Sequence, residues 1–497
     1  MQIAFQLHLI NPRIAAAVFA VCAAVGLHAG EAIRPDYLGI EIPPNIAPLN
    51  FRLSSGDGGK ASMAAADGTR IETSAKPGGL FAWNAGEWRK FLEAHRGESV
   101  EVRVSCEGKP DLVATNLIAV APIDSHLTYR LIEPGYEHFG EMGIYQRDLG
   151  SFAERPLYRN VQRSAGQCVN CHTYNMSDPG QYLFHTRLLD GGTHVVSRKW
   201  GVKKLDLKAD GMIGRGVYPA WHPSGDFIAF SLNETRQCFY SANPDKVEVF
   251  DLRSDLVLYS QADDSLMPIE TDPDWFETFP AWSPDGRCLY SVRAKVRVDS
   301  PSDDSSRRNV SASSRIHDFR YVLVARDFDV EGRAFSAPRV VYDGGNGKSV
   351  TLPRVSPDGR WLVMTVGPYG SFHVWHNDAD LCILDLRSGE VRMLDELNSP
   401  MSESYHTFSR SGEWMVFSSR RADGSYTRPQ FARFNSASGR FSKPFVLPVN
   451  DPADHDRRML SYNIPEFSDG PVAESQAFLR RLVSRPPTKA VRTPAEP

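Results

Sequence analysis

The sequence predicts an all-β protein, and three observations support that prediction. Short segments of alternating apolar and polar residues run through the first 130 residues, a turn motif occurs four times between residues 218 and 412, and an apolar strand follows each copy. With 497 residues and 41% hydrophobic content, the chain can form two or three globular domains. Its formal charge of −4 gives no indication of nucleic-acid binding.

Residues 1–30 have the composition of a secretory signal peptide. An uninterrupted apolar run, residues 14–27, follows Arg13 and precedes several small residues. The run is shorter than the roughly 20 residues that span a bilayer, and bulky Val21 before Cys22 disfavours a lipid anchor. We therefore expect a periplasmic or otherwise exported protein, and association with the membrane surface or the cell envelope is compatible with this.

Residues 34–130 are expected to form a separate β-rich domain. Its alternating segments are separated by clusters of Gly and Pro, and a small β-sandwich is the expected form. One helix is predicted over residues 85–95, because Trp88, Phe91 and Leu92 would share one of its faces.

The second half of the chain contains an internal repeat. Tyr218-Pro-Ala-Trp-His-Pro-Ser-Gly225 recurs at residues 279–286, at 352–359 and, in degenerate form, at 405–412. In the Ser-Pro-Asp-Gly turns, Pro fixes φ and Gly permits positive φ. Strand, tight turn and strand, with further strands behind, are typical of propeller blades of four strands each.

A β-propeller of about five blades is expected over residues 181–470. The segments 182–205 and 461–467 would combine into the fifth blade, so that N- and C-terminal strands close the ring and cover its edges. Six blades are the alternative, with strands recruited from residues 130–165. Residues 471–497 are expected to form a short helix and a disordered, Pro-rich tail.

Between these two regions, residues 131–180 carry the pattern C-x-x-C-H as Cys168, Cys171 and His172. This is the attachment signature of a c-type haem, in which two thiols bond the porphyrin and the histidine is the proximal iron ligand. A zinc site would need a second ligand pair, and the remaining cysteines are isolated in the sequence. We therefore expect one covalent haem c, with His172 on the iron.

The second iron ligand is expected from a neighbouring segment. His222 is the leading candidate because it stands where other copies of the repeat have serine, although a surface-turn histidine would fit the same position. The other candidate ligands are His185, Met176 and Met212. The residues that could line the haem pocket, or else pack between domains, are Tyr136, His138, Met142, Tyr145 and Arg147.

The repeat resembles the WD-like propeller repeats of the TolB family over roughly residues 215–450. The order of export signal, β-domain, C-x-x-C-H and repeats also resembles a group of bacterial TolB-like proteins described as cytochrome c related. The resemblance implies a propeller and leaves the activity open, because propellers have many activities.

Three functions are compatible with these features. Two protein ligands on the iron would suit electron transfer or redox-dependent binding, with a redox partner or a propeller-docking protein. An open iron position beside His138 or Arg147 would suit peroxidase-like chemistry. The propeller could instead bind or cleave a polysaccharide or peptide, with Glu277, His406 or Glu466 as polar groups. Because no hydrolase, phosphate-loop or dinucleotide motif is present, electron transfer or binding is favoured over hydrolysis.

Overall fold

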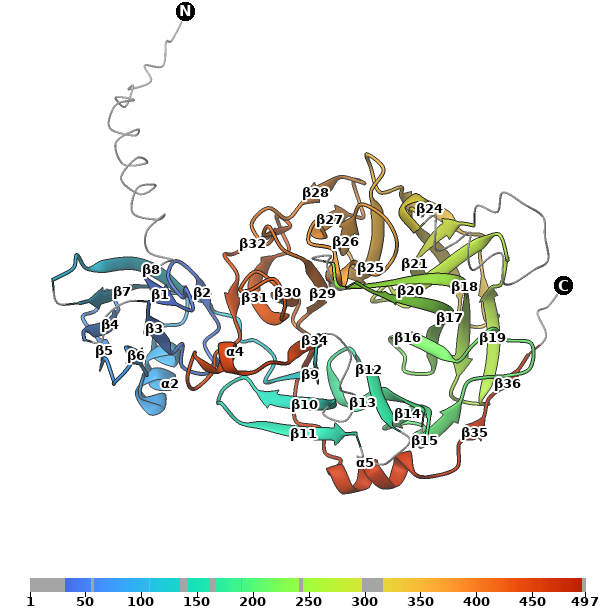
Figure 1. The fold of residues 1–497 in the computed structure, drawn as a ribbon, viewed down its shortest axis with the longest axis horizontal. Helices are drawn as coiled ribbons and strands as arrows, with labels where there is room; N and C mark the ends of the chain where they lie inside the picture. Colours follow the sequence, from blue (N-terminus) through green and yellow to red (C-terminus); the bar gives the residue numbers. More distant parts are fainter. Residues whose placement is uncertain are drawn as a thin grey trace, which may run out of the picture. The chain divides into compact units, whose positions relative to one another are not determined.

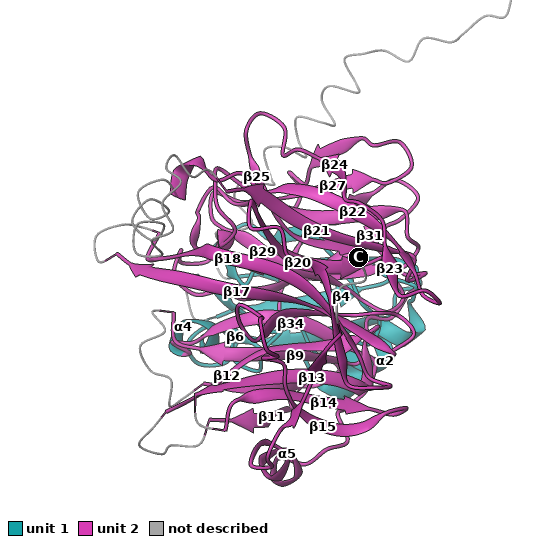
Figure 2. Ribbon diagram, turned by 90° about the vertical axis from the view of Figure 1, so that its right-hand side faces the viewer, with its two compact units in different colours: residues 1–120, 448–457 teal, residues 121–447, 458–497 magenta. Residues whose placement is uncertain are grey.

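The computed structural model divides the chain into two compact units. The described residues are 32–54, 58–106, 108–134, 142–160, 166–188, 190–240, 245–296 and 316–493. Unit 1 comprises residues 1–120 and 448–457, and unit 2 comprises residues 121–447 and 458–497 (Figure 2). The segment 131–180, expected as a separate haem-binding segment, is therefore part of unit 2.

The described residues of unit 1 form two sheets. The first contains β1 (Ile33–Arg34), β3 (Phe51–Leu53) and β6 (Leu80–Phe81). The second contains, in spatial order, β2 (Glu41–Ile42), β8 (Leu112–Ile118), β7 (Ser99–Ser105), β4 (Lys60–Ala64) and β5 (Arg70–Ser74). A short helix, α4 (Asp454–Arg457), also lies in this unit. The packing of the two sheets as a sandwich stays a prediction.

Helix α2 (Ala85–Ala94) confirms the helix predicted in unit 1. It begins after Asn84, whose side chain accepts hydrogen bonds from the backbone N–H groups of the first turn. Its buried residues are Trp88, Phe91 and Leu92, the predicted face.

The described residues of unit 2 form six sheets, whose inner strands surround the centre of the unit (Figure 1). The first sheet contains β34 (Ser461–Ser468), β9 (His126–Ile132), β10 (Gly143–Asp148) and β11 (Glu154–Arg159). The second contains β12 (Gln167–Asn175), β13 (Asp178–Leu188), β14 (Gly192–Ser197) and β15 (Gly201–Asp206). The third contains β16 (Gly216–Trp221), β17 (Phe227–Phe239), β18 (Val247–Ser260) and β19 (Ser265–Glu270).

The remaining three sheets follow in chain order. The fourth contains β20 (Trp275–Trp282), β21 (Cys288–Lys295), β22 (Val322–Asp329), β23 (Ala334–Phe335) and β24 (Arg339–Tyr342). The fifth contains β25 (Ser349–Val355), β26 (Trp361–Gly367), β27 (Asp380–Asp385) and β28 (Val391–Met393). The sixth contains β29 (Glu403–Phe408), β30 (Trp414–Ser419), β31 (Arg428–Asn435), β32 (Arg440–Phe441) and β33 (Phe445–Val446). The four predicted copies of the repeat supply the inner strands of the third to sixth sheets.

The predicted fifth blade is wrong in its composition. Strand β34 pairs antiparallel with β9, where Phe467 lies opposite Leu127, and residues 182–205 follow β12 in a different sheet. Residues 126–159 supply three strands of the sheet that contains β34, whereas the six-blade alternative recruited residues 130–165, and the number of blades stays a prediction. Those strands lack the Ser-Pro-Asp-Gly turn, so the sequence pattern did not identify them as part of the repeat.

The C-terminal segment corrects the prediction of a disordered tail. Helix α5 (Gln476–Val483) begins at Ser475, whose hydroxyl accepts a hydrogen bond from the Phe478 N–H. After it, β35 (Thr488–Lys489) pairs in parallel with β15, and β36 (Val491–Arg492) pairs in parallel with β19. The outer edges of two sheets offer backbone partners that composition alone did not reveal.

Some predictions lie outside the described residues. These are the signal peptide at residues 1–30 and the pocket residues Tyr136 and His138. Within the described residues, no helix has the length and apolar character needed to cross a bilayer.

Candidate functional site

The inner strand of each sheet in unit 2 bulges at an equivalent position. In β16, for example, Val217 pairs with Ser231 and Ala220 pairs with Ala229, so two residues between them interrupt the ladder. The first residue of each interruption has a φ between 40° and 53°, which is unusual for a residue other than glycine. These six residues are Cys171, Tyr218, Phe279, Leu352, Tyr405 and Ile464.

The C-x-x-C-H motif is therefore a copy of the repeat. Cys171 and His172 in β12 take the places of Tyr218 and Pro219 in β16. The positions equivalent to His172 hold Pro219, Pro280, Pro353, His406 and Pro465. Aligning Cys-His-Thr-Tyr of the motif with Tyr-Pro-Ala-Trp of the next copy would have revealed this from the sequence.

Both cysteines of the motif are free thiols. Cys168 is half-buried, and its Sγ lies 3.8 Å from the sulfur of Met142, one of the predicted pocket residues. Cys171 is buried, and burial raises the pKa of its thiol, against the opposing effect of Arg187 and Arg130. The structure thus places one thiol at the bulge and the other three residues earlier on the same strand.

The imidazole of His172 is buried, and neither ring nitrogen forms a hydrogen bond of good geometry, although the ring interacts with the backbone of Thr128 and Ile464. Burial lowers its pKa to about 3, against the opposing effect of the backbone of Thr128 and Ile464, so the ring is neutral. A neutral imidazole is the form that binds metals. At the equivalent position, His406 has a partner, because its Nε2 lies 2.9 Å from the carbonyl oxygen of Val363.

Two small cavities and one larger one adjoin the motif. His172 lines a cavity of about 40 Å³ together with Cys171, Tyr218 and Tyr405, and it also lines a second cavity of about 10 Å³. An open cavity of about 190 Å³, here called the axial funnel, shares Thr173, Pro219 and Arg354 with the first of these. The two small cavities have room for a few water molecules at most.

His222 has a partner at each ring nitrogen. Its Nδ1 lies 2.8 Å from the Ser224 hydroxyl oxygen, and its Nε2 lies 3.0 Å from the carbonyl oxygen of Gly286. It lines neither of the two cavities that His172 lines. His222 as an iron ligand stays a prediction, and ligation would have to break one of these contacts.

The other candidate ligands lie in different parts of unit 2. His185 on β13 pairs in register with Asn170, inside C-x-x-C-H, and its Nδ1 lies 2.9 Å from the Thr193 hydroxyl oxygen. Met176 is exposed and lines the axial funnel, whereas Met212 packs against the core between the second and third sheets. Of the pocket candidates on β10, Arg147 donates from Nε to the Asp148 carbonyl at 3.2 Å, and Tyr145 lies at a bulge.

The candidate polar groups of the propeller do not form one site. Glu277 accepts two hydrogen bonds from Arg326, at 2.8 and 3.0 Å, and burial raises its pKa to about 7. Glu466 accepts from the Thr173 hydroxyl at 2.9 Å, and burial raises its pKa to about 7 as well. Only Glu466 among Glu277, His406 and Glu466 lines the axial funnel.

Among the described residues, no group of three or more His, Cys, Asp or Glu side chains is arranged to hold a metal ion. The motif therefore does not extend into a site with zinc-type ligands in this part of the chain.

No family model and no curated protein matches this chain. Among solved structures, TolB from Acinetobacter baumannii has a TM-score of 0.42 at 12% identity, covering 77% of this chain and 85% of that chain. Oligogalacturonate lyase from Vibrio parahaemolyticus has a TM-score of 0.35 at 10% identity, covering 78% and 85%. Kuenenia stuttgartiensis hydrazine synthase has a TM-score of 0.38 at 12% identity, covering 67% and 48%. Likenesses of this strength carry no inference about activity.

Proposed function

We propose that unit 2 is a six-bladed propeller that carries one covalent haem c on β12, the inner strand of its second sheet. The protein would serve electron transfer or redox-dependent partner binding outside the cytoplasm. The supporting observation is that C-x-x-C-H occupies β12 in phase with the repeat, where the equivalent bulge residues of the other five inner strands lack a thiol.

The donor groups fit a c-type haem chemically. The thiols of Cys168 and Cys171 are not engaged in disulfides, and His172 offers a neutral imidazole that has no hydrogen bond of good geometry. When bound, the haem would supply a one-electron redox centre. A single motif means that electrons would have to cross a contact with a redox partner protein.

The space beside the motif sets a condition on attachment. The cavities that His172 lines, about 40 and about 10 Å³, are far smaller than a porphyrin. Cys171 is only 7% exposed on an inner strand. The packing of the described residues around the motif therefore leaves no space for a porphyrin, and covalent attachment would require the second sheet to pack differently from this arrangement.

A redox titration followed by optical and electron paramagnetic spectra tests this function. The exported protein is expected to show one reversible one-electron step and low-spin iron that does not bind carbon monoxide, because protein ligands would hold both axial positions. The Cys168→Ala, Cys171→Ala double variant, which lacks both attachment thiols, is the control without haem. High-spin iron that binds carbon monoxide would contradict electron transfer and indicate an open iron site.

A further inference from the structure

On each inner strand, one residue directly follows the two residues that interrupt the ladder. These six residues lie at equivalent positions around the centre of unit 2. The strand registers place one such residue on each inner strand, two residues after the residue of positive φ. All six line the axial funnel, and they are Thr173, Ala220, Ala281, Arg354, Thr407 and Glu466. The inner strands that carry them surround the centre of unit 2 in Figure 1.

The fold does not require the two charged residues among these six. Two equivalent positions hold alanine and two hold threonine, so an uncharged small side chain satisfies the strand geometry. Placing an arginine and a glutamate at such partly buried positions costs free energy unless each finds a partner. A structural role in the repeat therefore does not account for Arg354, and it accounts for only one carboxylate oxygen of Glu466.

Both charged groups retain capacity to bind. Glu466 uses Oε1 for hydrogen bonds from the Thr173 hydroxyl and the Tyr174 N–H, at 2.9 and 3.0 Å, while its Oε2 is buried without a partner. Within the described part of the chain, no hydrogen bond or ion pair is formed by the Arg354 guanidinium. The charge of each side chain shifts the pKa of the other, but the two groups do not form an ion pair. Both line the axial funnel.

We propose that the axial funnel binds a small zwitterion, with its carboxylate on Arg354 and its ammonium group on Glu466. A guanidinium binds carboxylates through two parallel hydrogen bonds, and an ammonium group donates to the unpartnered carboxylate oxygen. Trp221, Trp282 and Phe408 supply an apolar wall for the rest of the ligand. The volume of about 190 Å³ is below the 300–1,000 Å³ typical of drug-sized ligands, so the ligand is of amino-acid size.

Calorimetric titration of the full protein tests this site, with zwitterions that differ in the distance between their ammonium and carboxylate groups. The probes are glycine, β-alanine and γ-aminobutyrate, with acetate and methylammonium as single-charge references. At least one zwitterion is expected to bind about tenfold more tightly than either reference, because two charge-assisted contacts form instead of one. No measurable binding of any zwitterion, or acetate binding as tightly as the best zwitterion, would overturn the proposal.

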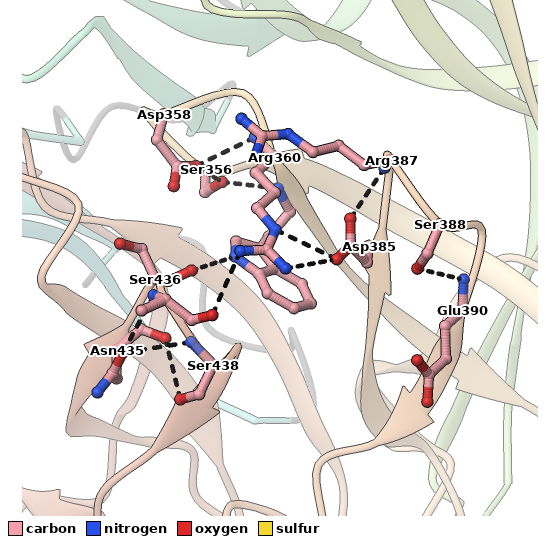
Figure 3. A network of polar contacts seen from close by, with 12 residues as sticks. Ser356, Asp358, Arg360, Asp385, Arg387, Ser388, Glu390, Asn435, Ser436 and Ser438 are labelled. Atoms are coloured by element: carbon pink, nitrogen blue, oxygen red, sulfur yellow. Dashed lines mark hydrogen bonds and ion pairs between the residues drawn. The ribbon is translucent and has the colours of Figure 1, made fainter.

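Variants assign the binding to the two residues. Arg354→Ala reproduces what two equivalent positions already hold, so it is expected to fold and to weaken zwitterion binding about tenfold or more. Glu466→Gln is expected to remove the preference for a zwitterion over acetate. The matched control is Arg360→Ala in the turn between β25 and β26, whose Nη2 lies 2.8 Å from the Asp385 carboxylate (Figure 3) and which is not among the residues that line the funnel. Unchanged binding in Arg354→Ala, or an equal loss in Arg360→Ala, would overturn the assignment.

Discussion

Replacing His172 with alanine is expected to convert the iron from low to high spin, whereas replacing His406 is expected to leave the iron spectrum unchanged. The two histidines occupy equivalent positions on β12 and β29. Nε2 of His406 lies 2.9 Å from the Val363 carbonyl oxygen, while neither ring nitrogen of His172 forms a hydrogen bond of comparable geometry. The proposal assigns the imidazole of His172 to the iron and that of His406 to the fold.

The pair of variants separates ligation from packing. Four equivalent positions hold proline, so loss of the imidazole is compatible with the strand geometry. His406→Ala is expected to lower the free energy of unfolding by about 2–5 kcal/mol, because it leaves a cavity at a buried site and removes the hydrogen bond to the Val363 carbonyl. Identical spectra for the two variants, recorded by electron paramagnetic resonance, would contradict His172 as the proximal ligand.

Replacing Arg326 with methionine is expected to lower the free energy of unfolding by ~3–5 kcal/mol at alkaline pH, because it leaves Glu277 as an uncompensated buried charge. Arg326 and Glu277 are both almost fully buried and lie 2.8 Å apart. Denaturant unfolding measures the loss. The double variant with Glu277→Leu is expected to recover most of it, since no charge then stays buried.

The stability of the Arg326→Met variant is expected to fall as the pH rises. Burial already raises the pKa of Glu277 to about 7 with Arg326 present, and loss of the guanidinium would raise this pKa further. The folded state then binds a proton that the unfolded state releases, so stability is retained at acidic pH and falls as pH rises through the folded-state pKa. If Arg326→Met lowered the free energy of unfolding equally at pH 5 and pH 9, the buried charge of Glu277 would not be the cause of the destabilisation.

The sequence predicted those sheets whose repeat copies kept their turn chemistry. The motifs around Gly225, Gly286 and Gly359 have the Pro and Gly that a tight turn needs, and each marks an inner strand followed by its hairpin partner. Strands β9 to β11 lack that signal, and the pairing of β9 with β34 joins residues more than 300 positions apart in the sequence. Local propensity carries no information about such pairing, which is why the closing sheet was assigned wrongly.

The site was predicted in part for the same reason. The thiols and His172 are recognisable from spacing alone, and Glu466 was one of the candidate polar groups, whereas Arg354 stands at an ordinary position of a strand more than 100 residues from Glu466. Only the ring of sheets brings them to one cavity. His222 appeared as a candidate ligand because serine stands at that place in other copies, yet its side chain contacts Ser224 and Gly286 in the turn region.

The intact mass of the exported protein after unfolding tests the central claim most directly. Cells that attach haem c covalently are expected to yield a chain heavier by one haem, and the added mass is expected to vanish in the Cys168→Ala, Cys171→Ala double variant. Cys382→Ala, which removes a buried free thiol on β27, is the matched control and is expected to keep the haem. A native chain without added mass, or a double variant that retains it, would contradict covalent haem attachment at this motif.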